Sequence, residues 1–327
     1  MKHHYVPVFY QKLFAASDGL LWVYDRKLGT YKQLHPLAVC FQNDLYAFEG
    51  TSKPNQIVET QFLSLIDGSS SAAFKKLPTV LVSPPRILLA EILYFSALQY
   101  LRVPANKRFI SAVYEVGGND MMEAAFGTLE RAKASLRRYA ADRAEELGVT
   151  PESMVKAVTS GAVRATATER PFLESIMEQS EKLTDVFRSL DIKILISPPQ
   201  VGFVLSDNPV TVVPPPGVSA AGFQSPRTFT FVPLTRSLCL RLGQRGSGKG
   251  PKNIDREKVR YINENTASNS DRFVMGPSKI QLESVIRRSQ SENMNNTERF
   301  TIKKTLEEDG ILRELIGQPR RVHYVEV

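Results

Sequence analysis

The sequence is poor in the residues that most often carry metal or redox chemistry: its 327 residues include two cysteines and four histidines. Cys40 and Cys239 lie far apart in apolar stretches, so we expect two buried thiols rather than a disulfide or a metal pair. No two histidines have the i, i+4 spacing of a helical metal site, and neither Cys-x-x-Cys nor His-Glu-x-x-His occurs. These absences argue against a zinc site.

Long hydrophobic runs are also missing. No stretch approaches the ~18 consecutive apolar residues that a membrane-spanning helix needs. The opening MKHHYVPVFY has one lysine followed by polar and aromatic residues, which does not fit a secretory signal. Apolar residues make up 42% of the chain and charged residues 23%, which excludes a wholly disordered or collagen-like chain. We therefore expect a soluble, cytoplasmic protein with no membrane partner.

The periodicity of apolar residues divides the chain into four segments. Strand-like alternation at the start gives way to a long helical stretch, after which short strands return and a polar end follows. The predicted fold class is α+β, with a mixed or antiparallel sheet built from N- and C-terminal strands around a large helical insertion. The segments are residues 1–50 (β-hairpin region), 54–190 (helical region), 191–290 (strands that complete the sheet) and 291–327 (polar link and tail).

Individual elements can be placed within these segments. Residues 20–25 and 31–34 read as the two strands of a hairpin. Pro84-Pro85 opens a helix that is apolar nearly all round and is therefore expected at the centre of the helical region. Residues 121–147 are predicted to form one further helix, and residues 255–267 another.

Several groups of residues resemble a known family. They are His4-Tyr5-Val6-Pro7 with Phe9-Tyr10 and Leu13-Phe14, the run Leu21-Trp22-Val23-Tyr24-Asp25, Ser206-Asp207-Asn208-Pro209-Val210, and Asn263, Ala267 and Asn269 before Arg272-Phe273-Val274. This pattern is similar to the bacterial domain-of-unknown-function family 4238, which opens with His-x-x-Pro-x-Phe-Tyr-Leu-x-x-Phe. Gln11 stands where that family often has leucine. The resemblance covers roughly residues 3–276 and implies a shared architecture, but it implies no particular activity.

The best candidates for a reactive site are His4, Asp207, Asn208 and Asn263, because each lies at the end of an element. A histidine beside an aspartate can act as a general acid or base, with the carboxylate as its orienter, and an asparagine amide can position a developing oxyanion. The alternative is structural: Asp207-Asn208-Pro209 forms an Asx turn, and His4 pins the N-terminus by a hydrogen bond. Asp207 with water molecules is compatible with a magnesium site, which needs few protein ligands, and the cofactor is otherwise unknown.

Positive charge is concentrated in one part of the chain. The whole chain has 42 Lys and Arg against 34 Asp and Glu, a formal net charge of +8, and residues 236–288 hold twelve basic against five acidic residues. Such a local surplus suits a phosphate-bearing partner, and Lys249, Lys252 and Arg256 are predicted to hold the phosphates. The alternative is a solvated basic face without a partner.

The sequence of segment 243–250 resembles that of a phosphate-binding loop. It matches Gly-x-x-x-x-Gly-Lys, but Gly250-Pro251 follows Lys249 where a true loop has Ser or Thr and the start of a helix. Residues 243–252 are therefore predicted to form an exposed loop that binds no nucleotide in that fashion.

Two functional hypotheses follow. The leading one is a cytosolic protein that binds a phosphate-bearing partner, foremost nucleic acid, with nuclease-like hydrolysis by His4 and Asp207 as its catalytic form. The other is a non-catalytic recognition or scaffold protein that binds a protein partner through its helical region. Whether the chain is an enzyme is left open by the sequence.

Overall fold

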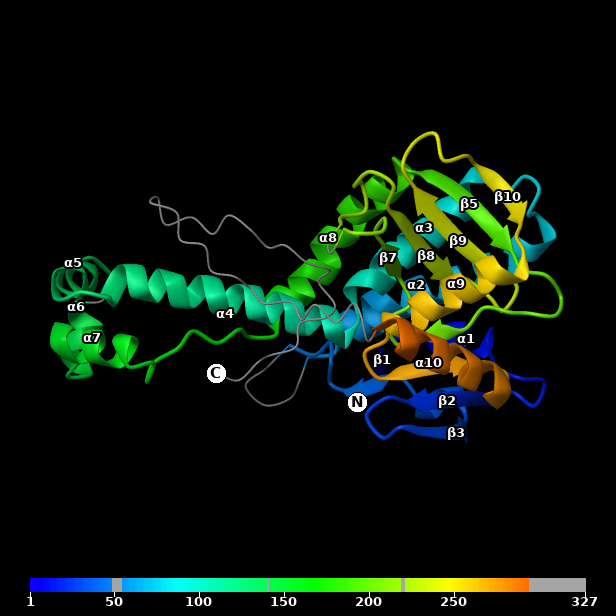
Figure 1. Cartoon of the computed structure of the whole chain (residues 1–327). Coiled ribbons are helices and arrows are strands. Elements are labelled where there is room, and N and C mark those ends of the chain that lie inside the picture. Colours follow the sequence, from blue (N-terminus) through cyan, green and yellow to red (C-terminus); the bar gives the residue numbers. More distant parts are fainter. Residues whose placement is uncertain (49–54, 140, 219–220, 294–327) are drawn as a thin grey trace.

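The computed structural model describes residues 1–48, 55–139, 141–218 and 221–293, and it confirms an α+β fold (Figure 1). Most of the predicted link and tail lies outside these residues, from 294 onward. The link was predicted to begin at 291, but the last described helix, α10, continues to Asn293.

A four-stranded antiparallel sheet joins the two ends of the chain, as predicted. Its order is β3-β2-β11-β6, so the N-terminal hairpin pairs with a C-terminal strand. Cross-strand pairs such as Tyr24 with Val274 fix the register. The strands are β2 (Leu21–Asp25), β3 (Thr30–Leu34), β6 (Leu205–Ser206) and β11 (Phe273–Gly276).

The remaining C-terminal strands do not complete that sheet, which corrects the interpretation of a single sheet. They form a second, five-stranded sheet of order β10-β5-β9-β8-β7, antiparallel except for the parallel pair β10 and β5. The chain crosses between the sheets at Asp207-Asn208-Pro209, because β6 ends at Ser206 and β7 begins at Thr211. The strands are β5 (Asp191–Ile196), β7 (Thr211–Val213), β8 (Phe229–Pro233), β9 (Leu238–Gly243) and β10 (Gly250–Asn253). A small third sheet pairs β1 (Lys2–His4) with β4 (Phe41–Asn43).

The central helix of the body is α3, as its apolar pattern predicts. It packs between α2 and α8, and Tyr10, Phe74 and Phe95 form an edge-to-face cluster beside it with ring centroids 5.0–5.6 Å apart. The Tyr10 hydroxyl donates to the Pro233 carbonyl, which ties the N-terminal segment to the five-stranded sheet. The helices and helical turns of the body are α1 (Val8–Lys12), η1 (Pro36–Ala38), η2 (Val58–Leu63), α2 (Ser64–Lys76), η3 (Leu77–Thr79), α3 (Arg86–Leu101) and α8 (Arg170–Arg188).

Part of the helical region projects from the body as an arm (Figure 1). Its long helix α4 (Pro104–Phe126) is buried mainly in its first turns, and three short helices lie at its far end. They are α5 (Leu129–Tyr139), α6 (Ala141–Glu146) and α7 (Pro151–Thr159). The single helix predicted for residues 121–147 is therefore wrong: α4 ends before Gly127, where a Cβ atom would lie 2.5 Å from the Glu123 carbonyl oxygen.

The junction of α3 and α4 is bent by 57°. Within the described residues no single helix has the length and hydropathy of a membrane span, whereas this bent pair meets those two criteria together.

The helices α9 (Arg256–Ser268) and α10 (Lys279–Asn293) pack on each other where the two sheets meet. The α9 helix starts as predicted because the Asp255 carboxylate accepts a hydrogen bond from the Lys258 amide at 2.8 Å. Leu282 and Ile286 of α10 pack with Tyr24 and Val274, so α10 covers one face of the four-stranded sheet. Residues of both α9 and α10 therefore line one pocket.

Candidate functional site

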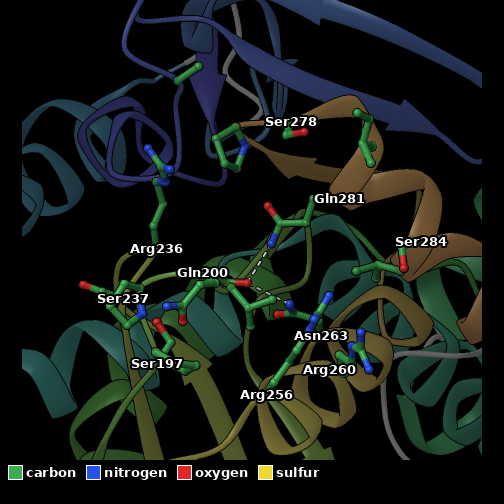
Figure 2. Close-up of a pocket in the computed structure, with 18 of the residues that line it drawn as sticks. Ser197, Gln200, Arg236, Ser237, Arg256, Arg260, Asn263, Ser278, Gln281 and Ser284 are labelled. Carbon is green, nitrogen blue, oxygen red and sulfur yellow. Dashed lines mark hydrogen bonds between the residues drawn. The ribbon is translucent and has the colours of Figure 1, made fainter.

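A pocket of about 1150 Å³ lies between residues 197–202, the turn that joins β8 to β9, and the first turns of α9 and α10 (Figure 2). Its polar lining consists of serines, side-chain amides and three arginines, and none of the described residues that line it is acidic. We call it the arginine pocket, after Arg236, Arg256 and Arg260. Figure 2 shows that Arg236 comes from the side opposite to Arg256 and Arg260.

The wall of the pocket is held together at Gly202. Figure 2 shows Asn263 of α9 and Gln281 of α10 converging on one carbonyl oxygen, that of Gly202, at 2.9 and 2.7 Å. The Asn263 side chain also accepts a hydrogen bond from the Val204 amide at 3.0 Å. Both polar atoms of the Asn263 side chain therefore position the backbone. These contacts favour a structural role for Asn263, which was predicted as a reactive-site residue.

Gly202 is needed because the chain passes close to the turn that carries Arg236. The Phe203 amide donates to the Arg236 carbonyl at 2.8 Å, and a Cβ atom on Gly202 would lie 2.9 Å from that same oxygen. Two backbone segments would have to move apart to admit a methyl group.

We expect Gly202→Ala to lower the free energy of unfolding by about 1–3 kcal/mol, since the clash is with backbone rather than with a flexible side chain. Gly68→Ala is the matched control, because Gly68 lies in α2 with nothing within 4 Å of its Cβ position. That control should raise stability by up to about 1 kcal/mol. Chemical denaturation measures the free energy of unfolding of both variants. If Gly202→Ala is as stable as Gly68→Ala, the approach of Gly202 to the Arg236 carbonyl does not constrain the backbone.

The three arginines differ in their partners. Arg260 is paired with Glu257 on α9, which offsets part of its charge. Arg236 and Arg256 are exposed and have no carboxylate partner among the described residues. Their charges are therefore available to a ligand without an ion pair having to be broken.

The N-terminal end of α10 also lines the pocket. The amides of a helix's first turn have no intrahelical acceptor and carry the positive end of the helix dipole. Ser278, Ile280 and Gln281, at or just before this turn, line the pocket. Together with Arg236 and Arg256 they form a surface that favours an anion.

Asp207, a predicted site residue, lies elsewhere and is fully buried. Its carboxylate accepts hydrogen bonds from the amides of Asp271, Arg272 and Phe273 at 2.9, 2.7 and 3.0 Å. Burial, with a smaller contribution from Asp271, raises the pKa of Asp207 to about 7, although the three amides oppose that shift. These contacts favour the structural alternative for Asp207.

The neighbouring Asn208 is part of the same crossing between sheets. Its side chain donates to the Asn269 carbonyl at 3.0 Å, and Asn269 donates back to the Asn208 carbonyl at 2.8 Å. Arg272 forms a bidentate pair with Asp25 in the hairpin, with distances of 2.7 and 3.0 Å to one oxygen. The residues that resemble the family motifs thus join the hairpin, the crossing and β11.

His4 is held by different groups. Its Nε2 lies 3.3 Å from the Leu37 carbonyl oxygen, and its own carbonyl accepts a bond from Arg102 at 2.9 Å. Burial lowers the pKa of His4, and the Leu37 carbonyl opposes that effect. His4 thus contacts Leu37 and Arg102, whereas Asp207 and Asn263 hold backbone groups elsewhere, so the shared catalytic role of His4, Asp207, Asn208 and Asn263 stays a prediction.

Lys249 and Lys252 lie outside the arginine pocket. Lys249 is 3.8 Å from the Asp191 carboxylate, and Lys252 lies on the edge strand β10 near Lys193. Of the three predicted phosphate-binding residues, only Arg256 lines the pocket.

The backbone groups of the glycine-rich segment before β10 are not arranged as in a phosphate-binding loop. The Ser247 carbonyl accepts from Arg241 at 2.8 Å, and the Gly248 amide donates to Asp191 at 3.1 Å. A phosphate-binding loop instead directs several amides at its ligand. The predicted exposed loop is shorter than expected, because residues 250–252 belong to β10.

A second cavity, of about 440 Å³, lies beside the sheet crossing. Tyr5, Lys32 and the Asp25–Arg272 pair line it. Buried Cys40 also contacts it, and burial raises the pKa of this thiol well above its ordinary value, so it is not activated as a nucleophile. Cys40 and Cys239 are both free and buried, which confirms the prediction of two buried thiols.

The described residues contain no group of three or more His, Cys, Asp or Glu side chains placed to hold a metal ion.

Sequence reasoning missed Arg236, Arg260 and Gln281 as pocket residues. Arg256, Arg260 and Asn263 are spaced i, i+4 and i+7, which places them on one face of α9, and that spacing was visible in the sequence. Arg236 and Gln281 carry no such signal, because they reach the pocket only through the packing of a turn and of α10.

These features define an α+β protein in which N- and C-terminal strands share a sheet, a helical arm is inserted between them, and a cationic pocket lies at the α9–α10 junction. The chain belongs to the family described as protein of unknown function (DUF4238), whose model matches residues 2–279. No curated protein and no solved structure matches the chain.

Proposed function

We propose that the chain is a cytoplasmic protein that binds a phosphate-bearing partner, nucleic acid, in the arginine pocket. The observation that carries this proposal is a large pocket with three arginines and no acidic residue among its described lining residues. Phosphate oxygens accept hydrogen bonds from arginine, serine, side-chain amides and helix N-termini, which are the groups present here. The basic surplus of residues 236–288 adds long-range attraction for a polyanion.

The proposal is binding rather than cleavage. Both oxygens of Asp207 accept amide hydrogen bonds, and the Nε2 atom of His4 lies 3.3 Å from the Leu37 carbonyl oxygen, so these contacts add no support for hydrolysis, and the catalytic role of the two residues stays a prediction. The pocket itself offers no carboxylate among its described residues to hold magnesium.

The test is the affinity for a labelled DNA duplex of wild type and of the double variant Arg236→Gln/Arg256→Gln. We expect affinity to fall at least about tenfold, since each lost charged contact contributes about 1 kcal/mol or more. Both side chains are exposed, so the unfolding midpoint should hardly change.

Lys249→Gln/Lys252→Gln is the matched control, because it removes the same charge outside the pocket. It should lower affinity much less than the arginine double variant. Equal losses in the two variants, or no binding by wild type at low salt, would refute binding in the arginine pocket.

A second candidate function, binding of a protein partner, is favoured by the arm. The arm projects from the body (Figure 1). The side chains of Tyr114, Met121 and Leu129 on the arm are apolar and exposed. A wild type that binds no nucleic acid at low salt would favour this candidate.

A further inference from the structure

We infer that the arginine pocket binds double-stranded nucleic acid through one phosphate backbone and does not read its bases. This inference rests on the proposed function and specifies the form of nucleic acid that the site takes.

The first argument is the absence of stacking surfaces. None of the described residues that line the pocket is aromatic. Sites for single strands combine a basic groove with aromatic side chains on which the bases stack. A duplex needs no such platform, because its bases are already stacked inside the helix and only phosphates and sugars face outward.

The second argument is that two of the three side-chain amides among the described lining residues, those of Asn263 and Gln281, already hold the backbone, whereas the third, Gln200, is exposed. Asparagine and glutamine recognise adenine with a free side-chain amide. Here the Asn263 amide nitrogen donates to Gly202, and its oxygen accepts from Val204. The Gln281 amide nitrogen donates to the same Gly202 carbonyl, as Figure 2 shows.

The third argument is the placement of the charges. Arg236 lies on one side of the pocket and Arg256 on the other, and neither has a carboxylate partner among the described residues (Figure 2). At about 1150 Å³ the pocket is larger than a single phosphate requires. A duplex backbone is a ridge of regularly spaced phosphates, and it can meet cations on both sides of a pocket at once.

The experiment compares the full-length chain on a short mixed-sequence DNA duplex, on each of its strands alone, and on a second duplex of unrelated sequence. We expect the first duplex to bind about tenfold more tightly than either strand, because its charge density is higher and the pocket offers no stacking. The two duplexes should bind within about twofold of each other. Arg236→Gln/Arg256→Gln should weaken both duplexes by a similar factor.

The outcomes separate this inference from the proposed function. Single strands that bind as tightly as the duplex, with the same dependence on Arg236 and Arg256, would overturn the duplex inference and leave the proposed function standing. A difference of more than about tenfold between the two duplexes would overturn base-independent binding. Equal affinity of wild type and Arg236→Gln/Arg256→Gln, or no binding by wild type, would refute both proposals.

Discussion

Replacing Asp207 with alanine is expected to lower the free energy of unfolding by roughly 3–6 kcal/mol, one of the two largest effects anticipated for this chain. The carboxylate accepts three backbone amides, from residues 271, 272 and 273, in a site that is 2% exposed. Alanine leaves all three donors buried without an acceptor, and each costs about 1–3 kcal/mol. Urea denaturation measures the change.

Asp185→Asn is the control, because Asp185 is exposed on α8 and forms an ion pair with Arg188. Its effect should stay within about 0.5 kcal/mol. A loss below about 1 kcal/mol in Asp207→Ala would show that the segment 271–273 finds other acceptors and that Asp207 does not hold the crossing.

The pH dependence of the Asp207 contribution has a definite sign. Burial raises the pKa of Asp207 to about 7, above its ordinary value of 3.8, so between these pH values the folded chain binds a proton that the unfolded chain has released. This contribution to stability therefore falls as pH rises from about 4 to about 7 and is constant above. The stability difference between wild type and Asp207→Asn should shrink over that window, and a difference that grows would contradict the shift.

Replacing Arg102 with methionine is expected to cost about 3–5 kcal/mol of unfolding free energy. The guanidinium is 1% exposed, donates to both oxygens of Asp67 at 2.7 and 3.1 Å, and donates to the His4 carbonyl at 2.9 Å. It thus ties the N-terminal strand to α2 and to the end of α3. Methionine fills much of the volume but leaves the Asp67 carboxylate and the His4 carbonyl without their donor.

A second variant separates the loss of the ion pair from the loss of packing. Arg102→Met/Asp67→Leu removes both charges of the ion pair and should be more stable than Arg102→Met alone, because the Asp67 carboxylate is no longer left without its partner. A double variant as unstable as the sum of the single variants would show that the two side chains contribute independently.

The sequence predicted the parts of the fold that depend on local pattern. The hairpin, the apolar helix after Pro84-Pro85 and the start of α9 follow from turn residues, periodicity and a capping aspartate. The sharing of a sheet by N- and C-terminal strands also followed, through the expected rejoining around the helical insertion. The division into two large sheets did not, because a strand of two residues followed by a buried crossing has no sequence period.

The candidate site was predicted less completely for a similar reason. Arg256 and Asn263 were named from charge and from motif, and both line the arginine pocket. Arg236 lies on a turn that reaches the pocket where its carbonyl approaches the backbone at Gly202 closely. Such a meeting of distant segments depends on tertiary packing and leaves no local signature.

The salt dependence of duplex binding tests the central claim most directly. Affinity for one DNA duplex would be measured over a series of salt concentrations for wild type and for Arg236→Gln/Arg256→Gln. If the two arginines each neutralise a phosphate, the slope of log affinity against log salt should be smaller in the double variant by about 1.8, since each contact contributes about 0.9. Lys249→Gln/Lys252→Gln should leave the slope nearly unchanged. Identical slopes for wild type and the arginine variant would contradict phosphate binding in the arginine pocket.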